Sequence, residues 1–390
     1  MRRLLVLTSA VVFLDTLFFS AIAPLLPHYA RDLGLTKAAA GVLAGAYPAG
    51  TLVAAVPAIW VARKVGVKGA LLLGLGLLAA SSVAFGLGNT VEVLDVSRFV
   101  QGAAGALCWS GSLAWLVATA PVDRRGAMIG TSLGLAVAGS LLGPVLGTAA
   151  EQFGDVLIFS LVALGALGLA AFAATTPGHA DASRVPGRRT LLAGLRDRSV
   201  QAAGWLNALY GLAFGALSVL VPLRLSSLGA SAAVVGLTFA LAAAGEMIAS
   251  PVAGRLADRG TRLSPVRAAL PAAALVLALL PVPDTVWIVA VLAVLCGPTV
   301  GALLAPAGAM LSDAASALGI GQVIAMALSN VAWSAGEMAG AAGGGGLAQA
   351  TADAVPYALL CAACVLTAIA LRPGARTARA ADAARAGAGS

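Results

Sequence analysis

The chain has 390 residues, of which 60% are hydrophobic and 10% are charged, with a net charge of +8. Because an ordinary soluble domain carries about 25% charged residues, this composition excludes a water-soluble globule and a disordered chain, and four cysteines are too few for a disulfide scaffold. At about 20 apolar residues per crossing, the hydrophobic content suffices for about twelve membrane-spanning helices.

The apolar runs predict twelve helices separated by short polar segments. In chain order they cover residues 4–27, 38–61, 68–88, 91–119, 126–149, 154–174, 200–223, 232–253, 264–282, 285–311, 318–345 and 354–371. The first run follows Arg2 and Arg3, as in a signal peptide. Asp15 within this run and Pro24 near its end nevertheless favour a retained first helix over a cleaved one.

The basic residues lie in short clusters between the apolar runs. If the N-terminus is cytoplasmic, only Arg31, Lys37, Arg98 and Arg224 of the 24 basic residues fall outside the inner segments. This asymmetry satisfies the positive-inside rule. We therefore expect both termini in the cytoplasm and a multi-pass protein of a bacterial inner (plasma) membrane. The positive charge then reports topology and not nucleic-acid binding.

The two halves of the chain repeat one pattern. Residues 58–68, after the second run, resemble residues 254–262, after the eighth, and Gly139 and Gly336 each begin three glycines spaced four apart. We expect two six-helix bundles related by a pseudo-twofold axis along the membrane normal. The expected divisions are an N-terminal bundle at 1–174, a cytoplasmic linker with an interfacial helix at 175–199, a C-terminal bundle at 200–371, and a disordered cytoplasmic tail at 372–390.

Duplicated halves in a membrane are typical of secondary transporters, in which the substrate site lies near the midplane between the halves. The fifth predicted helix carries a motif at Gly139, Gly143, Pro144 and Gly147. This motif resembles the antiporter signature of the twelve-helix drug:proton antiporters of the major facilitator superfamily. Glycines at every fourth position also let two helices approach closely, and the proline favours a bend, so we interpret the motif as part of a rocking interface.

Other segments carry the same resemblance. Residues 14–29 are similar to the first helix of vesicular amine transporters and their bacterial multidrug relatives, and residues 306–313, ending at Asp313, resemble the end of their tenth helix. Arg98, with Gln101 and Gly102, resembles the R-x-x-Q-G signature of the fourth helix. The resemblance covers nearly the whole chain and implies proton-driven export by alternating access.

The loop after the second helix departs from the family pattern. Ala62 stands where the family has an aspartate that takes part in the cytoplasmic gate, while Arg63 and Gly66 are retained. The second copy of the motif keeps the acidic residue and comprises Gly254, Asp258 and Arg259. We expect the second copy to carry the gating function that the first copy lacks.

Charged side chains inside membrane spans cost about 2.5–3.5 kcal/mol each at the helix centre, so they tend to serve function. Asp15 lies near the expected midplane, Glu337 in the outer half of helix 11, Glu246 in the inner half of helix 8 and Arg98 in the outer part of helix 4. A carboxyl group exposed alternately to two sides can carry a proton between them, and its anion can hold a cationic substrate. These four residues are the predicted proton and substrate coupling groups.

Structural interpretations of the same residues stay open. Asp15 could hydrogen-bond to a neighbouring hydroxyl or backbone group, and Glu246 could pair with a basic residue near 254–262. Arg98 could be neutralised by Asp95, three residues earlier on the same helix. A further set of side chains is predicted either to line the cavity or to pack in the core or against lipid, and it comprises Trp109, Trp115, Tyr210, Asn330 and Trp333.

The leading hypothesis is a proton-coupled exporter of small amphiphilic or cationic drugs or metabolites. The expected partners are a small-molecule substrate, protons and the lipid bilayer, with a monomeric chain and neither a cofactor nor a metal. Uptake or facilitated diffusion of a sugar or organic acid is the alternative. A membrane-embedded enzyme or signalling protein is a remote third, because the sequence contains no H-E-x-x-H, G-x-S-x-G or P-loop motif. We therefore expect no enzyme activity.

Overall fold

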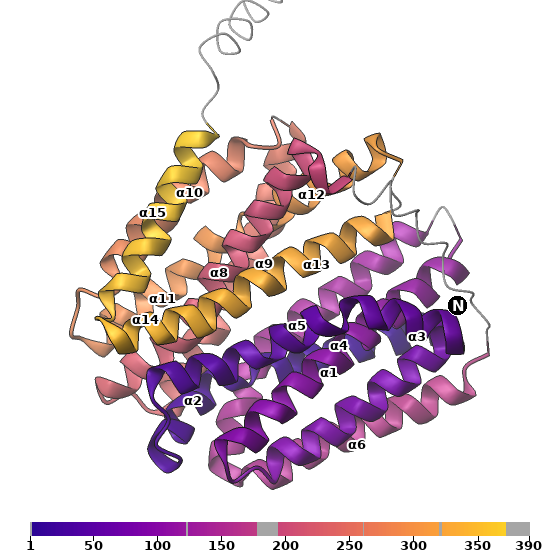
Figure 1. Ribbon diagram of the computed structural model, residues 1–390, viewed down its shortest axis with the longest axis horizontal. Helices are drawn as coiled ribbons and strands as arrows, with labels where there is room; N and C mark the ends of the chain where they lie inside the picture. Colours follow the sequence, from indigo (N-terminus) through magenta and orange to yellow (C-terminus); the bar gives the residue numbers. More distant parts are fainter. Residues whose placement is uncertain (1, 122–123, 178–193, 260, 320–321, 372–390) are drawn as a thin grey trace, which may run out of the picture.

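The computed structural model describes residues 2–121, 124–177, 194–259, 261–319 and 322–371. Within these ranges the chain folds into helices and forms no strand (Figure 1). The helix expected in the linker falls on residues 188–198, of which 188–193 lie outside the described residues, and the expected tail at 372–390 lies wholly outside them.

The helices of the first half are α1 (Arg2–Ser20), α2 (Ile22–Asp32), α3 (Lys37–Gly86), α4 (Val91–Thr119), α5 (Arg125–Phe153) and α6 (Asp155–Thr175). The predicted first helix is divided into α1 and α2 at Ala21, three residues before Pro24, whose ring removes a backbone donor. The predicted second and third helices are the two arms of α3. They meet at Gly66, whose φ of +76° is a backbone conformation that glycine adopts readily.

The helices of the second half are α8 (Arg198–Ser227), α9 (Ala232–Arg259), α10 (Ser264–Leu279), α11 (Val286–Gly301), α12 (Leu304–Ala317), α13 (Gln322–Met338), the π-helical turn η1 (Ala339–Gly343), α14 (Gly344–Ala350) and α15 (Ala354–Ala370). The predicted eleventh helix is thus interrupted by η1, which falls in its glycine-rich stretch.

Two helices of the second half are longer than predicted. α9 continues to Arg259, so Gly254 and Asp258 lie in its last turns and the assignment of these residues to a loop is wrong. α12 continues to Ala317, so Asp313 lies inside the helix and not at its end. The alanine-rich sequence has no breaker there until Gly319, whose φ of +66° suits the position after a helix end.

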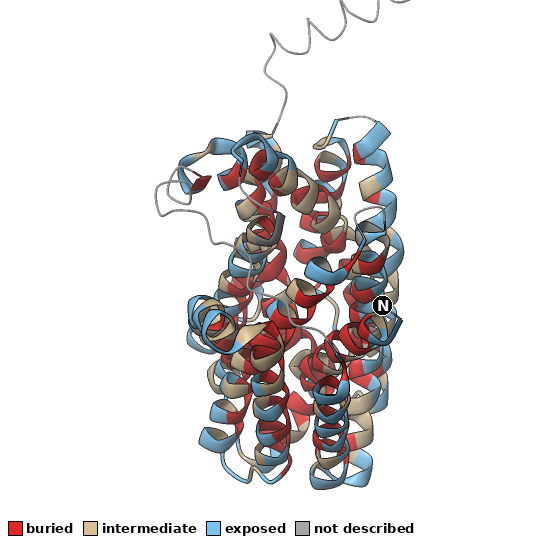
Figure 2. Cartoon of the chain, turned by 90° about the vertical axis from the view of Figure 1, so that its right-hand side faces the viewer, coloured by how far each residue is buried: buried red, intermediate tan, exposed pale blue. Residues whose placement is uncertain are grey.

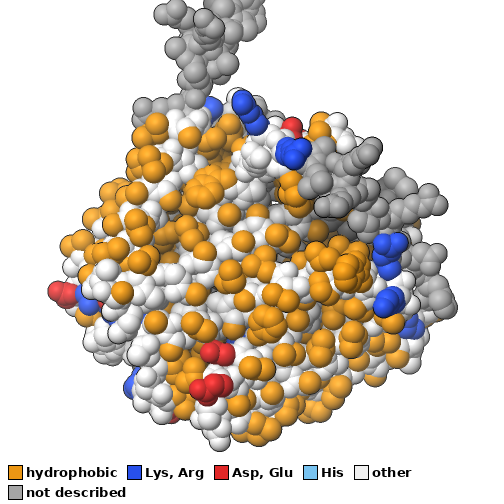
Figure 3. Space-filling model, in the orientation of Figure 1, with side chains coloured by type: hydrophobic (Ala, Val, Ile, Leu, Met, Phe, Trp, Pro, Cys, Tyr) orange, Lys and Arg blue, Asp and Glu red, His pale blue; other side chains and the backbone are white. Residues whose placement is uncertain are grey.

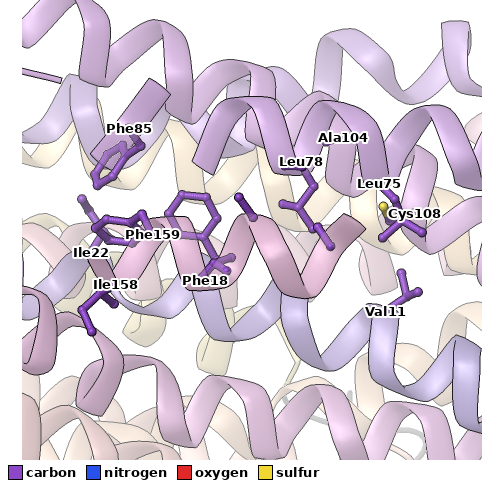
Figure 4. Close-up of a cluster of buried hydrophobic side chains, with 14 of the residues drawn as sticks. Val11, Phe18, Ile22, Leu75, Leu78, Phe85, Ala104, Cys108, Ile158 and Phe159 are labelled. Atoms are coloured by element: carbon purple, nitrogen blue, oxygen red, sulfur yellow. The ribbon is translucent and has the colours of Figure 1, made fainter. Parts of the chain in front are cut away.

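Each half has a large cluster of buried apolar side chains. In the first half Phe18, Phe85 and Phe159 pack together with ring centroids 4.9–5.7 Å apart (Figure 4). In the second half Leu270 and Leu277 are completely buried within a separate cluster. These two cores let each half behave as a packing unit.

The outside of the helical assembly is apolar. Hydrophobic side chains cover most of the face shown in Figure 3, while Lys and Arg side chains lie mainly along its upper and right edges. Figure 2 shows that the exposed residues lie on the outward sides and ends of the helices. Among the described residues seven helical segments are long and apolar enough to cross a membrane, and two shorter apolar helices, Ser264–Leu279 and Ala354–Ala370, accompany them. Such a surface is stable only in contact with lipid, so the chain is a multi-pass membrane protein.

Candidate functional site

A cavity of about 710 Å³ lies between the two halves. Its walls come from α1, α3, α4 and α5 on one side and from α8, α9, α11 and α13 on the other. The lining reaches Ala62, near the Gly66 turn, and Ile129 and Ile324, near the beginnings of α5 and α13. The cavity therefore extends toward the end of the molecule where these turns lie, and its size suits a drug-sized molecule.

The opposite end of the cavity is closed by aromatic side chains from both halves. The Phe19 ring stacks on Phe214 with centroids 5.9 Å apart, and Trp333 meets Phe19 edge-on at 5.8 Å. Beyond these rings α3 and η1 touch through their backbones, because a Cβ atom on Gly41 would lie 2.5 Å from the carbonyl oxygen of Ala341. The two halves are thus in direct contact at this end.

An ion pair between Lys37 and Asp353 also joins the halves at the closed end. Both side chains are partly exposed, and such pairs contribute about 0.2–1 kcal/mol. We predict that Lys37→Ala increases opening at this end about 1.5- to 5-fold. The measurement is the labelling rate of a cysteine at Ser20, which lines the cavity, by an impermeant thiol reagent added from that side to protein without its native cysteines. Equal rates with and without Lys37 would show that the pair does not hold the halves together.

Asp15 is completely buried and is held by two hydrogen bonds from other helices. The Tyr47 hydroxyl on α3 donates to its Oδ2 at 2.9 Å, and the Trp109 indole N–H on α4 donates to the same oxygen at 3.0 Å. Its Oδ1 has no hydrogen-bond partner among the described residues. Gly105 provides the space, since a Cβ atom there would lie 3.2 Å from both carboxyl oxygens and 2.7 Å from the Tyr47 hydroxyl.

Arg98 is buried beside this group and does not use the partner that sequence spacing offers. Its Nη1 donates to Gln101 Oε1 at 2.7 Å and its Nη2 donates to the Phe19 carbonyl oxygen at 3.3 Å. Its guanidinium carbon lies 5.3 Å from the centre of the Tyr47 ring, within range of a cation-π contact. The interpretation in which Asp95 neutralises Arg98 is wrong, because neither hydrogen bond of Arg98 goes to Asp95.

Glu246 lines the cavity and accepts a hydrogen bond from the Tyr210 hydroxyl at 2.5 Å. The interpretation in which Glu246 pairs with a basic residue near 254–262 is therefore not what the structure shows. Gly301 makes room for this side chain, because a Cβ atom there would lie 3.0 Å from Glu246 Cβ. A hydrogen bond between a tyrosine and a carboxyl group thus joins α8 to α9, just as the bond between Tyr47 and Asp15 joins α3 to α1. In the first half the acid lies on the first helix of the pair, and in the second half it lies on the second.

Glu337 is 2% exposed, at the end of α13, and lines the cavity. Within the part of the chain that the structure describes, its Oε2 has no hydrogen-bond partner. A buried carboxyl oxygen without a partner carries a desolvation cost of about 1–3 kcal/mol or more, which a cationic ligand in the cavity would relieve. Glu337 and Glu246 are therefore the acidic groups that face the cavity directly.

The other predicted cavity residues divide into two groups. Four of the five line the cavity, namely Trp109, Tyr210, Asn330 and Trp333. Trp115 is wrong as a cavity candidate, because it is 1% exposed in the core of the first half, with the Lys68 ammonium 5.9 Å from its ring centre. The sequence did not predict that Tyr47 and Phe214 line the cavity, because an aromatic residue in an apolar helix does not by itself indicate a binding site.

The glycines of the antiporter motif lie where α5 contacts α1 and the beginning of α2. A Cβ atom on Gly139 would lie 2.5 Å from the Phe13 carbonyl oxygen, and one on Gly147 would lie 2.7 Å from Pro24 Cγ. Gly143 contacts α1 in the same way, and Pro144 lies within α5 and lines the cavity. The glycines that begin at Gly336 pack in the same manner on α8.

Near the C-terminal end of α9, Arg262, Asp258 and Asp313 form a small cluster of charged side chains. Arg262 donates from Nε to Asp313 Oδ2 at 3.0 Å and also bonds to Asp258. These two carboxyl groups, Asp258 first, raise the pKa of Arg262, which lies outside the spans. In the first half the position of Asp258 is taken by Ala62, while Arg63 lies in α3 just before Gly66 and Arg259 ends α9. Among the described residues no group of His, Cys, Asp or Glu side chains could hold a metal ion.

The chain is similar to known membrane transport proteins. A family model described as Major Facilitator Superfamily matches residues 8–209 and again residues 203–389. A chloramphenicol resistance protein of Streptomyces lividans is 32% identical over 250 residues, which are 61% of this chain and 62% of that protein. The quinolone resistance protein NorA of Staphylococcus aureus is 28% identical over 161 residues, or 41% of each chain. Each match thus covers less than two thirds of the relative's length.

Solved structures share the fold at low sequence identity. The structure of a D-xylose-proton symporter matches 94% of this chain and 96% of its own with a TM-score of 0.74 at 16% identity. A bacterial homologue of the human lysosomal transporter Spinster, in an inward-facing and unoccupied conformation, matches 94% of this chain and 93% of its own with a TM-score of 0.71 at 14% identity.

Proposed function

The chain belongs to the major facilitator superfamily, a family of transporters and not of enzymes, and from this premise we propose that it exports small amphiphilic or cationic drugs or metabolites in exchange for protons. The observation that carries the proposal is the cavity between the halves, which combines apolar and aromatic walls with the cavity-facing acids Glu246 and Glu337. Resistance to chloramphenicol and to quinolones in the named relatives supports drug export.

The proposal includes a topology of twelve spans with both termini in the cytoplasm of a bacterial cell. The broken α3 supplies two spans that meet at Gly66, and α1 with α2, α11 with α12, and α13 with η1 and α14 each supply one. The two matches of the family model, at 8–209 and 203–389, support six-helix bundles at 1–174 and 200–371, joined by a linker at 175–199. The proposal takes the chain to function as a monomer.

Transport then proceeds by rocking of the two bundles around the cavity. In this conformation the end with Ala62 and Ile129 is open and the end with Gly41 and Ala341 is closed. Under the proposed topology the open end faces the cytoplasm, so a substrate enters from inside. The opposite conformation separates α3 from η1, and the closely packed α1–α5 and α8–α13 pairs each move as a unit.

Uptake of a sugar or organic acid remains the second candidate. It is favoured by Arg98, which lines the cavity and could hold an anion, and the symporter neighbour shares the fold alone. Arg98 donates to Gln101 and to the Phe19 carbonyl, but its Nε, like Glu337 Oε2, has no hydrogen-bond partner among the described residues. The described cavity lining contains the acids Glu246 and Glu337 against the single base Arg98, so its charge favours a cation.

The test is substrate-driven proton movement in proteoliposomes that contain the purified protein. We predict that a gradient of tetraphenylphosphonium drives protons in the opposite direction, detected by a pH-sensitive dye inside the vesicles. Asp15→Asn removes the titratable group, so proton movement should fall to the rate of protein-free vesicles. The matched control is Asp284→Asn, at a surface pair with Arg224, which should keep the wild-type rate. Cation flux without proton movement in the wild type would refute antiport.

A further inference from the structure

On the premise that the chain is a proton-coupled transporter, we propose that its proton site and substrate site are separate, and that Trp109 links them. Asp15 takes the proton behind the cavity wall, Glu337 and Glu246 meet the cationic substrate, and the Trp109 side chain belongs to both sites. A single carboxyl group shared by proton and substrate is the opposite arrangement.

Asp15 lies behind the wall of the cavity. Its side chain is 0% exposed, and the cavity wall in front of it consists of Tyr47, Gly105 and Trp109. The absence of a side chain at Gly105 places the carboxyl group directly behind the wall, 3.2 Å from where a Cβ atom would lie. A proton or a water molecule needs only a small opening to reach it, while a drug-sized cation does not reach it without displacing the wall.

The two oxygens of the Asp15 carboxyl group differ in their hydrogen bonds. Both donors, the Tyr47 hydroxyl and the Trp109 N–H, bind Oδ2, while Oδ1 has no partner. A proton therefore leaves a hydronium ion of bulk water and binds Oδ1, and it later passes to a water molecule on the other side, so that one O–H bond breaks for each one that forms. Protonation weakens the acceptor Oδ2, because hydrogen bonds to an ionised group are about twice as strong as neutral ones.

The Trp109 side chain connects the proton site with the substrate site. Trp109 donates to Asp15 Oδ2 through its indole nitrogen and also lines the cavity. When protonation of Asp15 weakens this bond, the Trp109 ring becomes free to change its position at the wall that the substrate contacts. Trp109 is thus a positioning residue through which protonation changes substrate affinity.

The charged and titratable groups around Asp15 are few. Tyr47 faces it from α3, and Arg98 and Cys108 face it from α4. Glu337 on α13 acts electrostatically on Tyr47 and Arg98 but is not among the groups that act on Asp15 itself. The described residues of α5 and α6, which also pack on α1, add no charged side chain next to the carboxyl group. Asp15 is therefore the acid whose protonation directly changes the strength of the Trp109 hydrogen bond.

Trp333 offers a matched control for Trp109. It lines the same cavity, but its indole nitrogen has no hydrogen-bond partner. A change of either residue to phenylalanine keeps an aromatic ring and removes the N–H group. Only in Trp109→Phe does this remove a hydrogen bond to an acid.

The experiment is binding of labelled tetraphenylphosphonium to the purified full-length protein as a function of pH. Wild-type affinity should rise with pH as Asp15 and the two substrate-binding acids lose their protons, and the midpoint due to Asp15 is the one that Asp15→Asn abolishes. Trp109→Phe loses a bond that stabilises the ionised form, so its midpoint should move up by about one pH unit, and Tyr47→Phe should move it in the same direction. Trp333→Phe should keep the wild-type midpoint, and Asp15→Asn should still bind the cation but lose this midpoint, leaving only the pH dependence due to Glu246 and Glu337.

Three results would overturn the inference. They are loss of binding at every pH in folded Asp15→Asn, an unchanged midpoint in both Trp109→Phe and Tyr47→Phe, and an equal shift in Trp333→Phe. A second readout needs no ligand, because the difference in fluorescence between wild type and Trp109→Phe should titrate with pH and lose this titration in Asp15→Asn. If the wild type binds no cation but this fluorescence titrates, the proposed substrate class is wrong while Asp15 remains the proton site next to Trp109.

Discussion

Glu337→Gln is expected to reduce transport of a lipophilic cation more than about tenfold, because it removes the buried negative charge that the cavity presents to the substrate. The side chain is 2% exposed and lines the cavity, and its Oε2 has no protein partner. A bound cation would supply the missing interaction, and glutamine keeps the shape of the side chain without its charge. The loss should appear mainly as weaker binding.

The measurement is the concentration dependence of tetraphenylphosphonium uptake into proteoliposomes with wild-type and variant protein. Glu151→Gln is the control, since Glu151 pairs with Arg31 and does not line the cavity, and its uptake should equal that of the wild type. An electrically neutral substrate, if one is transported, should be affected much less by Glu337→Gln. Wild-type kinetics in folded Glu337→Gln would remove Glu337 from substrate recognition.

Gly147→Ala is expected to destabilise the protein by about 1–3 kcal/mol and to lower its transport rate, because it overpacks the contact of α5 with Ala21 and the beginning of α2. The added methyl group would overlap the Ala21 carbonyl oxygen and lie 2.7 Å from Pro24 Cγ. Ala21 lies where α1 ends and α2 begins, so a shift there also moves the residues of α1 that reach the cavity. The site and the helix contact are thus mechanically connected.

Gly134→Ala on the same helix is the matched control. A Cβ atom at Gly134 meets nothing within 4 Å, and alanine in a helix interior is more stable than glycine by about 0.5–1 kcal/mol. Thermal unfolding of the purified variants should therefore show a lower midpoint for Gly147→Ala and an unchanged or higher midpoint for Gly134→Ala. Equal midpoints for the two variants would mean that α5 and the beginning of α2 move apart at Gly147 without cost.

Much of the fold could be predicted because hydropathy is a local property. The ends of α6 and α15 agree closely with the predicted spans, since polar residues or glycine border both apolar runs. The extensions of α9 and α12 were missed because a helix continues past the membrane boundary until a breaker such as Gly319 stops it, and hydropathy does not detect that point.

The candidate site was predicted only in part. The sequence singled out Asp15, Glu246 and Glu337, because acids are rare in apolar runs. It could not rank them by access to the cavity, since access depends on which side of a helix faces the other half. The structure places Asp15 behind Trp109 and Glu337 in the cavity wall, so access to the cavity separates two acids that the sequence grouped together.

By itself the sequence determined that the chain is a helical membrane protein with a duplicated pattern. Composition, charge asymmetry and glycine spacing are properties of the sequence that do not depend on how the helices pack. Only the tertiary structure decided which side chains meet. The Tyr47–Asp15, Trp109–Asp15 and Tyr210–Glu246 bonds join residues 32, 94 and 36 positions apart. Such contacts depend on helix rotation and on the close approach that Gly105 and Gly301 permit. Neither is visible in the hydrophobic pattern of any single helix.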